Sequence, residues 1–172
     1  LEDFNALHGK KLILTGGEPL LHPQLEEILK IADGNEHTTK ISTNGYLINH
    51  PRFAFVLDYD IGFRVSLDGA KSAHNVIRGN PFAYDALVSA MKKMSEKDRQ
   101  IVIRTTVMRQ NASSIVDMLY DLNRMTKEDG LKIYSNNIWP VRNIGKACNG
   151  LMLSPSEYKK FLTLYEQVLT AR

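Results

Sequence analysis

Residues Lys11–Leu21 read KLILTGGEPLL, and this stretch decides which kind of fold the chain can adopt. Its first five residues form a short, mostly apolar run, which is typical of a strand buried in a sheet. The run stops at Gly16-Gly17, because glycine allows a sharp turn in which the backbone comes close to another group. The stretch therefore predicts a buried strand that ends in an open polar turn.

Extended and helical segments alternate through the rest of the chain. The predicted strands are Lys11–Thr15, Thr39–Thr43, Ile61–Leu67, Gln100–Met108 and Leu131–Ile138. The predicted helices are Pro23–Ala32, Ile48–Val56 with an interruption near Pro51, Pro81–Ser95, Ala112–Met125 and Ser154–Ala171. In the last helix Ser154 and Glu157 are spaced as a capping box. This alternation favours right-handed βαβ units, and so an α/β fold with a parallel sheet. Five strands do not close an eight-stranded barrel, so we expect a partial (βα) barrel.

Composition is that of an ordinary globular protein, with 43% apolar and 24% charged residues. The net charge of +3 is too small to indicate a nucleic acid or an anionic membrane as partner. No membrane span or signal peptide is visible, so we expect a cytoplasmic protein. Cys148 is the only cysteine, and one thiol cannot hold a metal cluster alone. The chain starts at Leu1 rather than Met, and we interpret residues 1–172 as one domain cut from a longer chain.

Small polar residues follow the predicted strands, where ligands of parallel sheets bind. Around Glu18, carbonyl and carboxylate oxygens would suit an ammonium group, and the alternative is a tight turn with a solvated glutamate. Ser66 and Asp68 share one face of a strand end and can hydrogen-bond ribose hydroxyls, unless they only cap the strand. Asn44 is better explained as a turn residue than as a ligand contact.

Three further residues each have two interpretations. His74 and Arg78 are four apart and meet if their segment is helical; Arg78 then offers a planar fork for a carboxylate. His74 either orients a ligand group or only braces the turn. Trp139 either forms a wall of an adenine pocket or is buried against a helix.

In this order, the motifs resemble those of radical S-adenosylmethionine (radical SAM) enzymes. Gly16–Pro19 is similar to the GGEP motif that recognises the amino group of SAM, and Ser42–Gly45 to the TNG turn. Val65–Gly69 resembles the S-[IL]-D-G segment near the SAM ribose and carboxylate. His74–Gly79 resembles the H-x-x-x-R-G stretch, whose arginine reaches the SAM carboxylate. Arg142–Ala147 resembles the R-x-x-G-[RK]-A loop of a subgroup with peptide maturases and cofactor-biosynthesis enzymes.

The resemblance implies an enzyme that splits SAM reductively and uses the 5′-deoxyadenosyl radical to abstract hydrogen from a peptide or cofactor precursor. The SAM-binding residues it implies are Gly16, Gly17, Glu18, Pro19, Ser66, Asp68 and Arg78. The family's C-x-x-x-C-x-x-C loop, which binds a 4Fe-4S cluster, is absent from this sequence, so the resemblance places it and the first strand upstream of Leu1. It also implies an electron donor such as flavodoxin or ferredoxin. The resemblance assigns no catalytic residue and no metal ligand within this chain, which alone would be inactive.

A second interpretation is a non-redox α/β module that binds SAM or another nucleotide, and a third is a scaffold with a vestigial site. Under the first two, we expect one concave surface to be lined by Gly16, Gly17, Glu18, Ser66, Asp68 and Arg78. A truncated sheet would also expose a strand edge near Lys11–Thr15, and exposed edges favour self-association.

Overall fold

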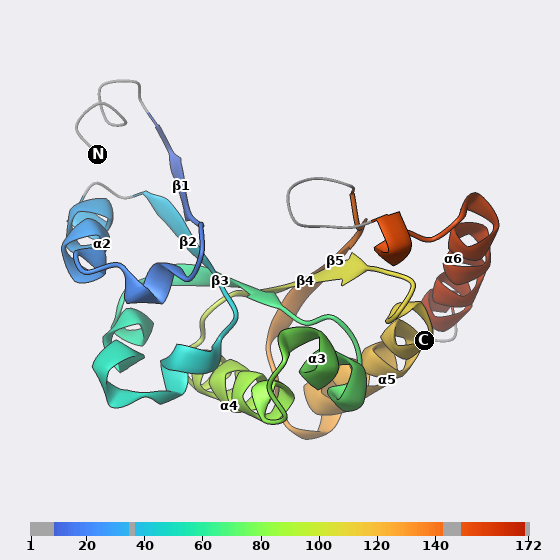
Figure 1. The fold of residues 1–172 in the computed structure, drawn as a ribbon. Coiled ribbons are helices and arrows are strands. Elements are labelled where there is room, and N and C mark those ends of the chain that lie inside the picture. The colour runs from blue at the N-terminus through green and yellow to red at the C-terminus, as the bar shows by residue number, and fades with distance from the viewer. Residues whose placement is uncertain (1–8, 35–36, 143–148, 171–172) are drawn as a thin grey trace. The chain divides into compact units, whose positions relative to one another are not determined.

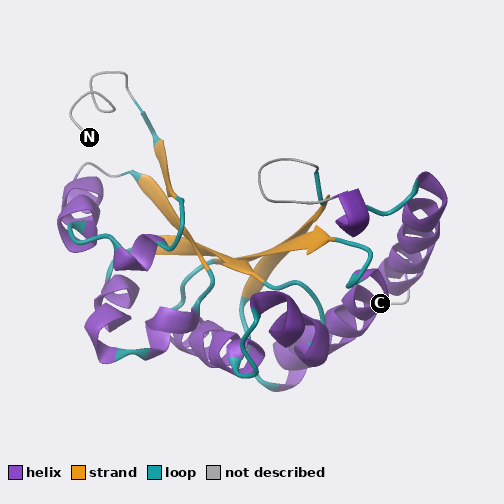
Figure 2. Ribbon diagram, viewed as in Figure 1, coloured by secondary structure: helices purple, strands orange, loops and turns teal. Residues whose placement is uncertain are grey.

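In the computed structural model the described residues are 9–34, 37–142 and 149–170 (Figure 1). Strands and helices alternate along the chain (Figure 2). The strands are β1 (Lys11–Leu14), β2 (Thr38–Thr43), β3 (Ile61–Ser66), β4 (Ile101–Val107) and β5 (Ile133–Pro140). They follow one another in the sheet in chain order, so β1 is an edge strand. The α/β fold with a parallel sheet is thereby confirmed.

Helical elements of two kinds connect the strands. The α-helices are α2 (Leu25–Gly34), α3 (Lys71–Arg78), α4 (Ala83–Glu96), α5 (Ala112–Glu128) and α6 (Pro155–Thr170). The 3₁₀ helices are η1 (Pro19–Leu21), η2 (Tyr46–Asn49), η3 (Pro51–Asp58) and η4 (Asn149–Leu151). Within the residues that the structure describes, no helix is long and apolar enough to cross a membrane.

The chain divides into two compact units. Unit 1 consists of Leu1–Ser66, Ala86–Ile103 and Leu131–Ser135, and unit 2 of Leu67–Asp85, Arg104–Gly130 and Asn136–Arg172. Because the chain passes between the units several times, the division does not follow a simple cut in the sequence. The organisation as a single domain stays a prediction.

In unit 1 the strands β1, β2 and β3 are parallel and in register, with Thr39 beside Ile61 and Ser42 beside Arg64. Side chains alternate between the two faces of a strand. One face supplies apolar core residues and the other carries polar ones. The core of this unit includes Leu29, Ile41, Ile48, Phe63, Val65, Leu87, Met91 and Met94, all at most 1% exposed. The two methionines thus fill the core, as their helical spacing predicts.

In unit 2 the apolar side of α5 is buried, as its spacing of three and four residues predicts. Its buried residues are Ile115, Met118, Leu119, Leu122 and Met125. Helix α6 contacts α5 and buries Phe161, which stacks between Tyr158 and Tyr165. At its start, the Ser154 amide donates to Glu157 Oε2 (2.7 Å) and the Glu157 amide to Ser154 Oγ (3.3 Å). The predicted capping box is confirmed.

The predicted interruption of the helix near Pro51 is present in the structure. The two parts, η2 and η3, are 3₁₀ helices in place of a short α-helix. His50 lies between them in an extended conformation, because the residue before a proline avoids the helical region. Its Nδ1 accepts the amide of Arg52 (3.1 Å) and so caps η3.

Candidate functional site

The turn after β1 is open to solvent. Gly16 has φ +151°, which side-chain-bearing residues rarely adopt, so the backbone itself requires glycine there. Gly16 and Gly17 are exposed, and a Cβ added at either would meet no described atom within 4 Å. The turn therefore presents bare backbone that a ligand can approach closely.

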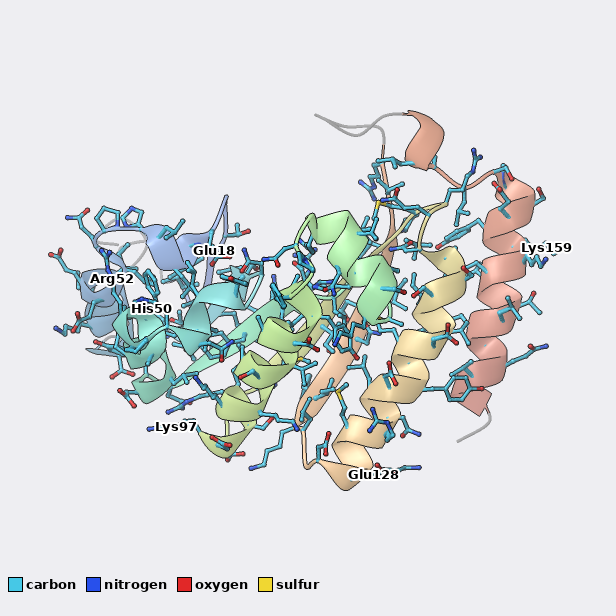
Figure 3. The ribbon with its side chains drawn as sticks, turned by 60° about the horizontal axis from the view of Figure 1, so that its bottom comes forward. Glu18, His50, Arg52, Lys97, Glu128 and Lys159 are labelled. Carbon is cyan, nitrogen blue, oxygen red and sulfur yellow. The ribbon has the colours of Figure 1, made fainter. Side chains whose placement is uncertain are left out.

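Glu18 uses most of its carboxylate inside the chain. Its Oε1 accepts from Thr43 Oγ1 (2.7 Å) and from the Leu20 amide (3.3 Å), and Oε2 accepts from the Asn44 amide (3.0 Å). A carboxylate offers about four lone-pair positions, so at most about one stays free for an ammonium group. Glu18, labelled in Figure 3, therefore ties the turn after β1 to the end of β2. Pro19 follows as the first residue of η1, where its missing amide costs nothing.

The turn after β2 is built by Asn44 and Gly45. Asn44 Oδ1 accepts the amide of Tyr46 (2.9 Å), which confirms the interpretation of Asn44 as a turn residue. Gly45 has φ +78°, and a Cβ there would lie 2.6 Å from Leu87 Cδ1. The positive φ favours glycine at this position, and a Cβ there would also force the Leu87 side chain on α4 to shift.

Ser66 ends β3 and is partly buried. Within the described part of the chain its hydroxyl has no hydrogen-bond partner. Among the predicted SAM contacts, Ser66 is therefore one whose polar group is not used by the described residues.

Unit 2 contains a cluster of polar side chains centred on Asp68, which is only 4% exposed. Its Oδ2 accepts from Arg78 Nη2 at 2.6 Å, and its Oδ1 from the Thr106 amide at 3.3 Å. A buried carboxylate needs such partners, since an unpaired charge would be costly to desolvate. The arrangement fixes Arg78, whose side chain stays 32% exposed. The other N–H groups of the guanidinium make no hydrogen bond to described residues.

His74 braces the same turn, which confirms the second of its two interpretations. Its Nδ1 accepts the amide of Asp68 (3.2 Å), and its ring lies edge-on to Tyr84 at 6.3 Å. Burial, followed by the charge of Arg78, lowers the pKa of His74 to about 4, although Asp68 acts in the opposite direction. The imidazole is therefore neutral at pH 7. His74 and Arg78 both lie in helix α3, which is the condition under which the sequence predicts that they meet.

Asn111 completes the cluster and was not among the residues that the sequence indicated. It is fully buried, its Nδ2 donates to the carbonyls of Asp68 (2.7 Å) and Thr106 (2.8 Å), and its Oδ1 accepts the Met108 amide (2.7 Å). Asparagine directly before a helix indicates an N-cap. The N-cap signal in the sequence therefore marks this position. In the structure, however, the Asn111 side chain holds the loop beside Asp68.

Other predicted features lie outside these clusters. Trp139 is 52% exposed, so its burial against a helix is wrong, and the adenine wall stays a prediction. Cys148 and most of the loop over Arg142–Ala147 lie outside the described residues. Among the described residues no group of three or more His, Cys, Asp or Glu side chains could hold a metal ion.

Comparisons with known proteins agree with the family resemblance of the sequence motifs. The family model described as Radical SAM superfamily matches residues 1–122. Fe-coproporphyrin III synthase of Methanosarcina barkeri is 27% identical over 71% of this chain and 31% of its own length. Pre-heme d1 synthase of Dinoroseobacter shibae is 30% identical over 69% of this chain and 30% of its own length.

Among solved structures, anSMEcpe with bound AdoMet and the Kp18Cys peptide superimposes with a TM-score of 0.68. The match covers 91% of this chain and 46% of that one at 19% identity, and so shows a shared fold. The chain spans about a third of the length of the two curated relatives.

Proposed function

Because this chain belongs to the radical SAM superfamily, we propose that it is the part of a radical SAM enzyme that binds SAM. The superfamily uses SAM and a 4Fe-4S cluster, and when bound they supply the reductive cleavage that yields a 5′-deoxyadenosyl radical for hydrogen abstraction. Cys148 is the only cysteine in the sequence, so the three cluster ligands would come from outside these 172 residues. The proposed SAM-binding residues are Gly16, Gly17, Glu18, Pro19, Ser66, Asp68 and Arg78.

The observation that carries this proposal is the Arg78 guanidinium, held by a buried carboxylate while most of its N–H groups stay unbonded to the described residues. A fixed planar fork of donors suits the carboxylate of an amino acid. The bare backbone at Gly16-Gly17 offers carbonyl oxygens to an ammonium group, and Ser66 offers a hydroxyl to a ribose. Three kinds of group in SAM thus have matching partners in this chain.

The two carboxylates act mainly through the groups that they hold. Glu18 fixes the turn at Gly16-Gly17, and Asp68 fixes Arg78. In this proposal the two carboxylates border SAM and also position the neighbouring groups that contact it, with Asp68 itself almost fully buried.

For the whole enzyme we propose a peptide or a cofactor precursor as substrate, and flavodoxin or ferredoxin as electron donor. The curated relatives are named for Fe-coproporphyrin III and pre-heme d1, and the superimposed structure of anSMEcpe contains a bound peptide. The second candidate is a SAM- or nucleotide-binding module without redox chemistry.

Isothermal titration of the chain with SAM, and separately with adenosine, tests the SAM site. We expect Arg78→Lys to weaken SAM binding at least about tenfold, since one charge-assisted hydrogen bond contributes about 1.5–3 kcal/mol. Adenosine binding should not change, because adenosine has no carboxylate. Arg78→Lys keeps a positive charge beside Asp68, and Arg52→Gln on exposed η3 is the control. Equal SAM affinity in wild type and Arg78→Lys would contradict the role of Arg78.

Loading of the full-length enzyme with iron separates the two candidates. A radical SAM enzyme forms 5′-deoxyadenosine from SAM when a chemical reductant is added, whereas a binding module leaves SAM intact.

A further inference from the structure

The polar face of the sheet in unit 1 carries positive charge. Lys40 lies beside Gly62 in the register of β2 and β3, and Ser42 lies beside Arg64. Because side chains alternate, these residues lie on the face opposite to the one that buries Ile41. Lys40, Ser42 and Arg64 thus form a contiguous patch on two neighbouring strands.

Lys40 lies across β3 and is held there. Its Nζ donates to Gln100 Oε1 (2.5 Å), and a Cβ added at Gly62 would lie 3.3 Å from Lys40 Cγ and 3.5 Å from Cε. The absent side chain of Gly62 therefore gives the lysine its path over the strand. Burial, together with the charges of Lys11 and Arg64, lowers the pKa of Lys40. The ammonium group is thus close to two other cations, and its hydrogen bond goes to a neutral amide.

Two further polar groups of the patch have no partner among the described residues. Arg64 is partly buried and makes no ion pair or hydrogen bond with them. Ser42 Oγ is buried without a hydrogen-bond partner. A buried polar group without a partner is rare and costs about 1–3 kcal/mol. One face of the sheet thus carries cationic donors and an unpaired hydroxyl, and no described carboxylate is bonded to them. A bound anion would supply the missing partners.

We propose that Arg64, Ser42 and Lys40 bind a carboxylate of the substrate. Ser66 lies two residues beyond Arg64 on the same strand, about 6.6 Å further along it and on the same face. Because Ser66 is a proposed SAM contact, a group bound at Arg64 would lie next to the SAM site, and for this reason we assign the patch to the substrate. This inference therefore rests on the proposed function. A substrate held by its anionic group at Arg64 would have the rest of its length free to reach the cofactor.

Citrate is the probe for this site, because it carries several carboxylates and no adenosine. Calorimetric titration at pH 7 and low ionic strength measures its dissociation constant, which we expect to rise at least fivefold in Arg64→Gln. Arg52→Gln removes an exposed positive charge of unit 1 and should leave citrate binding unchanged. Equal citrate affinity in wild type and Arg64→Gln would overturn the proposal, as would inorganic phosphate binding tighter than citrate.

Titration of the same variants with SAM separates the two sources of a carboxylate. SAM affinity should stay within twofold in Arg64→Gln, and a loss as large as that for citrate would assign Arg64 to SAM and overturn the substrate anchor. If no variant binds SAM but Arg64→Gln still loses citrate, the proposed function fails and the anion site stands.

Variants that preserve the fold support the test. Arg64→Lys keeps the charge without the planar fork and should give an intermediate citrate affinity. Lys40→Gln should weaken citrate at least twofold, and circular dichroism checks that each variant is folded. Citrate binding that resists both changes in folded protein would overturn the proposal.

Discussion

Acid should destabilise the chain through His74. The folded state holds this imidazole neutral with a pKa of about 4, whereas the ordinary value is 6.5. Between these pH values the unfolded chain binds a proton that the folded chain does not, so the free energy of unfolding falls as the pH is lowered. The contribution is fully present above pH 6.5 and is lost progressively towards pH 4.

The magnitude follows from the two pKa values. At about 1.4 kcal/mol for each tenfold difference in proton affinity, the whole effect is about 3 kcal/mol. Lowering the pH from about 7.5 to about 5.0 should remove about 2 kcal/mol of it. Protonation at Nδ1 would also break the bond from the Asp68 amide and place a charge near Arg78.

Urea denaturation followed by circular dichroism at the two pH values measures this effect. His74→Asn is the matched variant, because its Oδ1 takes the place of Nδ1 as acceptor for the Asp68 amide and does not titrate. The difference between wild type and His74→Asn should therefore change by about 2 kcal/mol between the two pH values, while other titrating groups cancel. An unchanged difference would refute the assignment of His74 as a neutral brace.

Three further predictions concern the turns at Glu18 and Gly45 and the iron–sulfur cluster. Glu18→Gln should lower the free energy of unfolding by about 1–2 kcal/mol, since an amide nitrogen cannot accept the Asn44 amide; Glu128→Gln on exposed α5 is the control in urea denaturation. Gly45→Ala should cost about 1 kcal/mol more than Gly130→Ala, because both have positive φ but only Gly45 is packed against a side chain. Anaerobic reconstitution of this chain should give no stable 4Fe-4S cluster, and recovery of close to four irons per chain would contradict the placement of the cluster ligands.

The sequence predicted the fold well where hydrophobic periodicity is strong. All five strands and the helices α2, α4, α5 and α6 were expected within a few residues of their observed bounds. Helix α3 was only conditional, because KSAHNVIR has few apolar residues and depends on Asp68, Ser114 and the Gly79 cap. Around Pro51 the sequence predicted a short helix with an interruption but not its 3₁₀ character, since an i to i+3 pattern over so few residues does not differ clearly from one helical turn.

For the site, sequence motifs identified positions better than they identified roles. The GGEP and S-L-D-G stretches marked Glu18 and Asp68 because carboxylates there are easily read as ligand groups. Their partners, the Thr43 hydroxyl and the Arg78 guanidinium, become clear only when the chain is folded. Asn111 was missed because its side chain bonds across 43 residues of sequence, which no local pattern encodes.

Hydrogen bonds within the chain occupy acceptor positions of Glu18 and Asp68, whereas the exposed Asp60 lines a pocket together with Lys40. Asp68 is itself buried and accepts from only one nitrogen of Arg78, so the remaining N–H groups keep their capacity to bond an anion. Glu18 accepts three hydrogen bonds, which leaves the carbonyl oxygens of Gly16-Gly17 as the main acceptors of the turn. On the polar sheet face, Lys40 meets an amide in place of a carboxylate. A buried acid that holds the fold, and a guanidinium with N–H groups left unbonded, are features expected of a site for anionic ligands.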